Sequence, residues 1–234
     1  KTAYASLGAN SYKHTVTGGG SPKDIETILQ LVYLNFTSPR FDQTDLDNLK
    51  KLYVPYFQNM ESDPNYSMRR EFTKTLYNNN ARRQITNAAQ IEALNIDALK
   101  AVHNKLYGYA DDFRFVIVGN VDLNTLKPLV EKYIGSLPTS KKVEYAVVDD
   151  GVRVVTGEVT NDFKATMQQP KVSVYMTYTG EMEYNAKNRM VMDLLSRALD
   201  SRYLVSIREE KGGTYGVQVQ GGMEEHPTET YSML

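Results

Sequence analysis

The sequence predicts a mixed α and β protein organised in two unequal blocks. Three observations predict it: amphipathic helical patterns fill much of the first half, a β-rich run covers residues 113–118, and strand-like alternation follows residue 151. The polar and charged residues 139–150 separate the two blocks and are predicted to form an interdomain linker. Helices with an apolar stripe must bury it against another element such as a sheet, and the first block has few strands. Both blocks are therefore expected to be incomplete domains.

The helices of the first block are predicted from their start and stop signals. Ser21 is expected to cap the first helix, with Pro22 at its first position and Ser38-Pro39 closing it, and Gly18-Gly19-Gly20 is expected to form a flexible turn into it. Pro55 is expected to kink or end the second helix. The other predicted helices begin near Thr44 and at Asp63-Pro64, with shorter ones over about residues 87–94 and 96–108.

The remaining elements alternate between strands and helices. Phe113–Val118 is predicted to be a buried strand, and Asp122 to cap a helix that stops at Gly135. Strands are also predicted over residues 152–159, 172–178 and 214–219, with a helix of about five turns from Ala186 toward Arg208 between the last two, stopped by Gly212-Gly213.

Composition and charge exclude several classes of function. Lys and Arg number 27 against 28 Asp and Glu, so no overall field favours nucleic acid or an anionic membrane surface. The longest apolar stretches are too short to span a bilayer. Cysteine is absent, which excludes disulfides, thiolate zinc sites and cysteine nucleophiles. The chain opens on Lys1 rather than Met, so we expect it to be a piece of a longer protein.

The three histidines do not predict a metal site. His14, His103 and His226 have no second His at ligand spacing, and His103 is expected at the surface or its boundary. The segment Gly222–His226 matches the inverted zinc motif H-x-x-E-H only in part, because Gly222 replaces the first ligand. The sequence therefore predicts no bound metal within these residues.

The segment from Ile207 to Gly216 is the strongest candidate site. A helix ends on a charged turn, two glycines reverse the chain, and Tyr215 opens the next strand, so Arg208 and Tyr215 are expected to lie close together. A guanidinium and a phenol can both donate to a peptide carbonyl or to a developing oxyanion. The alternative is a helix end with a surface arginine and an edge-strand tyrosine.

The same segment resembles the motif R-E-x-x-G-x-x-Y, which marks the C-terminal half of pitrilysin/insulinase-family zinc peptidases. Gly18–Phe36 and the run FRFVIVGNVDLNTLKPLVEKYIGSLP, from Phe113 to Pro138, agree with that family. The resemblance covers nearly the whole chain and is closest to the bacterial members.

The resemblance implies an α+β fold with mainly antiparallel sheets covered by helices, repeated as domains. It implies that residues 1–138 are the later part of the penultimate domain, 139–150 the linker and 151–234 the first part of the final domain. Arg208 and Tyr215 would then bind the substrate carbonyl and stabilise the reaction intermediate, with Gly213 also contacting substrate.

In that family the zinc motif H-x-x-E-H and a distal glutamate lie in the first domain, outside this chain. The resemblance therefore implies a zinc-dependent endopeptidase of unstructured peptides, with zinc bound by an N-terminal catalytic half in the same chain or in a partner. The chain alone is expected to be inactive. The alternative is a non-catalytic structural or partner subunit of the same family. A bacterial periplasmic location is expected from what is usual in this family.

Overall fold

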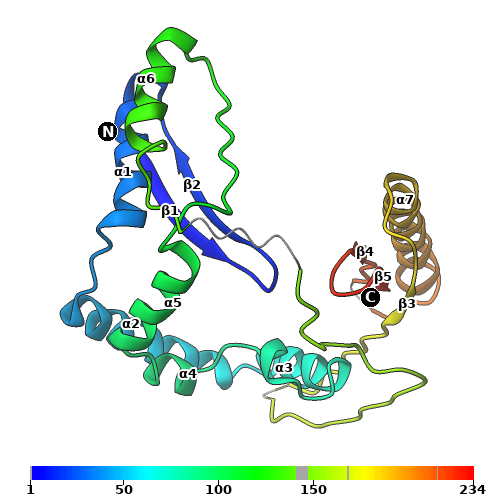
Figure 1. Ribbon diagram of the computed structural model, residues 1–234. Coiled ribbons are helices and arrows are strands. Elements are labelled where there is room, and N and C mark those ends of the chain that lie inside the picture. Colours follow the sequence, from blue (N-terminus) through cyan, green and yellow to red (C-terminus); the bar gives the residue numbers. More distant parts are fainter. Residues whose placement is uncertain (1, 141–146, 168, 215) are drawn as a thin grey trace. The chain divides into compact units, whose positions relative to one another are not determined.

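The computed structural model describes residues 2–140, 147–167, 169–214 and 216–234 (Figure 1). The chain divides into two compact units, the first made of Lys1–Phe57 with Asn87–Ala146 and the second of Gln58–Thr86 with Val147–Leu234. Residues 141–146 of the predicted linker lie outside the described part. The domain boundaries expected from the sequence stay a prediction.

The first unit contains a β-hairpin that the sequence analysis missed. Strand β1 (Tyr4–Ala9) pairs antiparallel with β2 (His14–Gly19). The side chain of Asn10 shapes the turn between them by accepting hydrogen bonds from the backbone N–H groups of Tyr12 and Lys13. Gly18 and Gly19 therefore belong to a strand rather than to a flexible turn. The pattern hid this, because residues depleted in strands, namely two Ala and one Gly in β1 and two Gly in β2, interrupt both segments.

Helices occupy the positions that their capping signals predict. Asp63 and Asp122 each accept a backbone N–H in the first turn of their helix, whereas the Ser21 side chain makes no such bond. Pro55 does not end its helix, which continues to Glu61. The helices are α1 (Ile25–Thr37, after a 3-10 turn at Pro22–Asp24), α2 (Gln43–Glu61), α3 (Pro64–Leu76), α4 (Ala88–Glu92), α5 (Ile96–Tyr107), α6 (Leu123–Tyr133) and α7 (Ala186–Tyr203).

Helix α1 covers the hairpin and builds the core of the first unit (Figure 1). Val32 and Phe36 on α1 are buried with Leu137, and Val16 of β2 packs against them. Phe113 closes the cluster, with its ring 5.0 Å from that of Phe36 in an edge-to-face arrangement. The core of this unit is therefore a helix packed on one face of a small antiparallel sheet.

The prediction of a buried strand at Phe113–Val118 is wrong. Phe113 reaches the core, but Val116 is 75% and Val118 92% exposed. A strand needs a neighbour to complete its backbone hydrogen bonds, and within the described ranges no such ladder joins residues 114–118 to another segment. For the same reason residues 152–159, 172–177 and the described part of 214–219 are not strands.

The second unit contains a three-stranded antiparallel sheet. Its strands are β3 (Tyr178–Glu181), β4 (Gly221–Glu224) and β5 (Thr230–Met233), and β5 lies in the middle. Helix α7 packs on β4 through Met192 and Ser196, and a Cβ added at Gly221 would come within 3.1 Å of the Ser196 side chain. The mixed fold of helices on antiparallel sheets agrees with the predicted α+β class.

A membrane-spanning helix is not found among the described residues, since no helix there is both long and apolar enough.

Candidate functional site

The candidate site lies where α7 ends. Asn185 starts the helix by accepting the backbone N–H of Asn188, and the last regular residue is Tyr203. The chain then widens into a π-helical turn, η3 (Leu204–Glu209), in which the N–H of Glu210 donates to the carbonyl of Val205 at 3.0 Å. Such π-helical turns occur often at functional sites, because they change the direction in which side chains project.

Two glycines then end the helix as the sequence predicts. The N–H of Gly212 donates to the carbonyl of Arg208 at 3.1 Å, and the N–H of Gly213 to that of Ile207 at 3.0 Å. Gly212 has a φ of +58°, a left-handed conformation that suits glycine. These bonds satisfy carbonyls that the helix end would otherwise leave unpaired, and they fix the backbone that carries Arg208.

Arg208 projects from this turn toward solvent. Its side chain is exposed, and in the described part of the chain its guanidinium makes no hydrogen bond or ion pair. An arginine without an internal partner retains all five donors for a ligand. Gly213 is also exposed. Tyr215 lies outside the described residues, so its expected closeness to Arg208 stays a prediction.

His226 and His14 each lie beside a carboxylate. His226 follows strand β4, with Nε2 3.9 Å from a Glu225 carboxylate oxygen. His14 is on β2, with Nε2 3.5 Å from a carboxylate oxygen of Asp112. Among the residues described, no three His, Cys, Asp or Glu side chains gather as a metal site would require. The side chains of the described residues therefore do not fit a resident zinc ion.

His103 corrects the sequence analysis, which expected it at the surface or its boundary. The side chain is buried, with 8% exposed, and packs against the rings of Phe41 and Tyr107. Its Nε2 lies 2.8 Å from the carbonyl oxygen of Asn35, near the end of α1, so Nε2 carries the proton and donates. This role is structural: it satisfies a carbonyl in the last turn of that helix.

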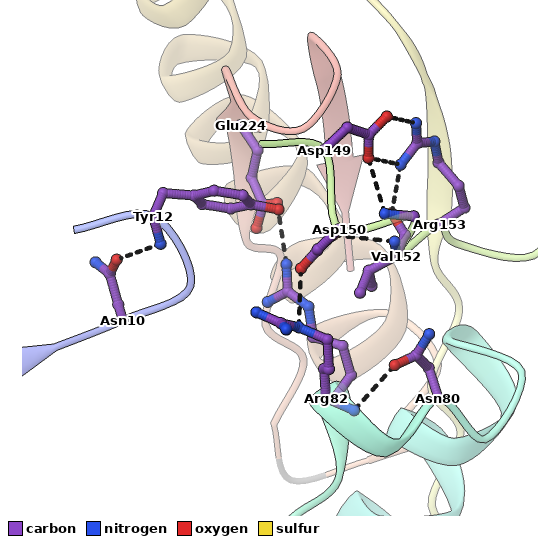
Figure 2. Close-up of polar contacts among 11 residues, drawn as sticks. Asn10, Tyr12, Asn80, Arg82, Asp149, Asp150, Val152, Arg153 and Glu224 are labelled. Carbon is purple, nitrogen blue, oxygen red and sulfur yellow. Dashed lines mark hydrogen bonds and ion pairs between the residues drawn. The ribbon is translucent and has the colours of Figure 1, made fainter. Parts of the chain in front are cut away.

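A second polar cluster, missed by the sequence analysis, joins the 3-10 turn Ala81–Arg83, which follows α3, to residues 149–153 (Figure 2). Arg153 donates through both terminal nitrogens to the Asp149 carboxylate, and Arg82 Nε lies 3.2 Å from a carboxylate oxygen of Asp150. The bond from Arg153, aided by the N–H of Gly151, lowers the pKa of Asp149 to about 2. Asp149 and Arg153 are four residues apart, so their pairing could have been predicted from the sequence. Arg82 and Asp150 are far apart in the sequence, so their pairing could not.

The fold and a match to a known protein family together define the class of protein. The model of the Peptidase M16 inactive domain matches residues 93–226, so the chain belongs to the M16 peptidase family. This confirms the resemblance to pitrilysin/insulinase-type peptidases. The matched range contains both α7 and the glycine turn after it.

The particular relatives are bacterial. Proteins named as the probable zinc protease PqqL share 20% identity over 88% of the chain in Haemophilus influenzae and 23% over 80% in Escherichia coli. The chain spans 22% and 20% of their lengths, about a fifth of each.

Two solved structures share the fold. The periplasmic protease PqqL from Escherichia coli superposes with a TM-score of 0.78 at 18% identity, covering 99% of this chain and 25% of that one. The ferredoxin protease FusC, solved in complex with Arabidopsis ferredoxin, gives a TM-score of 0.71 at 15% identity, covering 100% of this chain and 25% of that one.

Proposed function

We propose that this chain is the substrate-binding, C-terminal part of a zinc-dependent metalloendopeptidase that hydrolyses unstructured peptides. The observation that carries the proposal is Arg208, which is exposed on the helix end that leads into the glycine turn and has no internal partner among the described residues. Membership of the M16 family and the names of the bacterial relatives support it.

In this proposal Arg208 and Tyr215 bind the substrate from one side. The guanidinium donates to a substrate carbonyl, and the phenol donates to the oxygen that gains negative charge during peptide hydrolysis. Gly213, which has no side chain, allows the peptide to approach the backbone of the turn closely. Zinc is held outside residues 1–234, by an N-terminal catalytic half in the same polypeptide or in a partner chain. A periplasmic location fits the description of one solved relative.

The test is Tyr215→Phe in the full-length enzyme, which removes one donor and keeps the ring. A donor used mainly in the transition state should lower kcat by about ten- to a hundredfold and change KM less. Arg208→Lys is expected to lower kcat/KM as well, because lysine lacks the planar fork. Turnover is measured on a quenched unstructured peptide, with Lys187→Arg on α7 as the control.

An unchanged kcat in Tyr215→Phe would remove that residue from the reaction. Zinc content measured beside activity separates the proposal from its alternative. A full-length protein that binds no zinc and cleaves nothing would identify the chain as a structural or partner subunit of the family.

A further inference from the structure

The segment of residues 214–219 leads from the glycine turn back to the middle of α7. Gly221, the first residue of β4, lies against the side chain of Ser196 on that helix. The glycine turn fixes the start of the segment, and two bonds of 2.8 Å between the backbones of Gln220 and Leu234 fix its end. Within the described ranges, the segment itself makes no hydrogen bond to another backbone group. Its position between the two ends therefore depends on side chains.

Asp200, in the last turns of α7, supplies such a side chain. Its Oδ1 accepts a hydrogen bond from the backbone N–H of Val219 at 2.8 Å, across 19 positions of the sequence. Asp200 and Val219 are both half-buried, and a carboxylate acceptor shielded from water makes a strong bond. In the part of the chain that the structure describes, no other hydrogen bond joins the segment to α7.

The place of this bond along α7 matches the length of the segment. Asp200 precedes Arg208 by eight residues, which is about 12 Å along a helix axis. Val219 follows Tyr215 by four residues, and four residues of extended chain reach about 13 Å. Holding Val219 at Asp200 therefore lets a side chain four positions earlier reach the level of Arg208.

We propose that Asp200 is a positioning residue for Tyr215. By holding Val219 on α7, it keeps the segment where the phenol can act together with the guanidinium of Arg208. Without this bond the segment keeps its two ends but gains freedom between them, and a displacement of about 1 Å is enough to impair a catalytic donor. The inference rests on the proposed function and adds to it a residue that touches no substrate.

The test compares Asp200 variants of the full-length enzyme on the quenched peptide. Asp200→Ala removes the acceptor and should fold, because alanine favours a helix and Asp200 is only half-buried. We expect kcat to fall about three- to tenfold and KM to change less, since a donor used in the transition state is displaced. Asp200→Asn keeps an acceptor oxygen and should retain most of the turnover. Asp193→Ala is the matched control and should leave kcat unchanged, because that carboxylate pairs with Arg197 on the same helix.

A double-mutant cycle shows whether the loss acts through Tyr215. In the Tyr215→Phe background, Asp200→Ala should lower kcat by less than about twofold, because the hydroxyl that it positions is already gone. Hydrogen exchange tests the bond itself. The Val219 amide should exchange faster in Asp200→Ala than in the parent enzyme.

Four results would each overturn the inference: an unchanged kcat in Asp200→Ala, an equal loss in both backgrounds, a loss that Asp200→Asn does not reduce, and unchanged exchange at Val219. Each of them leaves the proposed function standing, because that depends on the turnover of Tyr215→Phe. If Tyr215→Phe keeps its full turnover, the proposed function and this inference fail together.

Discussion

Burial separates the polar residues that hold the fold from those available to a ligand. His103 is nearly buried and bonded to the Asn35 carbonyl, whereas Arg208 is exposed on a turn. The sequence predicted Arg208 as a site residue and His103 as a surface or boundary residue. Their surroundings differ, because the buried imidazole has a carbonyl partner and stabilises the fold, whereas the exposed guanidinium is accessible to a ligand.

His103→Ala should destabilise the first unit by roughly 1–3 kcal/mol, because it leaves the partly buried Asn35 carbonyl without its partner and removes a buried ring. Urea unfolding followed by circular dichroism measures the change. Val102→Ala, on the same helix at a position 55% exposed, is the matched control and should change stability by about 0.5 kcal/mol or less. Equal effects of the two substitutions would contradict the structural role of His103.

The Asp149 carboxylate should titrate at about pH 2 in the folded chain, because Arg153 and the N–H of Gly151 stabilise its charged form. The folded pKa is below the ordinary value of about 3.9, so the stabilisation is present at neutral pH and is lost as pH falls from about 4 to about 2. Carbon NMR of the carboxyl group in Arg153→Gln should show the pKa rising toward its ordinary value. Arg197→Gln should leave it where it is.

At the scale of secondary structure, local signals predicted helices well and strands poorly. Asp63 and Asp122 cap their helices through bonds made within three residues along the chain. The strand predicted at residues 113–118 would need a partner from elsewhere, and the described residues supply none. Helix boundaries are therefore readable from neighbours in sequence, whereas strand formation depends on chain segments far apart.

Gly212→Ala should destabilise the end of α7 by roughly 1–2 kcal/mol, because alanine disfavours the left-handed conformation at φ +58°. Gly222→Ala is the control: both positions have open space for a methyl group, but Gly222 lies in strand β4 without a positive φ. Thermal unfolding of both variants measures the difference. An identical midpoint for the two would show that the turn does not depend on glycine.

At the scale of the whole molecule, much apolar surface is left uncovered. Met190 and Leu194 on α7 are 66% and 60% exposed, and Val172 and Val174 are 89% and 75% exposed. Soluble proteins seldom expose so many neighbouring apolar side chains without a partner. The chain covers only about a fifth of its curated relatives, so most of such a longer protein would lie outside these residues.

The isolated chain is therefore expected to self-associate as its concentration rises. Sedimentation velocity over a range of concentrations measures this. Met190→Lys with Leu194→Lys should reduce association, because the two substitutions remove apolar area from the exposed face of α7. Lys187→Glu alters charge on the same helix without removing apolar area and should have little effect. A monomer at all concentrations would rule the expectation out.

The sequence by itself determined most of the helices, the caps at Asp63 and Asp122, the glycine turn after α7 and the family, because each depends on short segments read in order. Only the tertiary structure decided the β1–β2 hairpin, the burial of His103 between α1 and α5, and the pairing of Arg82 with Asp150. Those features join residues that are close in space but separated along the chain. Pairing, burial and charge neutralisation depend on distance in space, which the order of residues does not state.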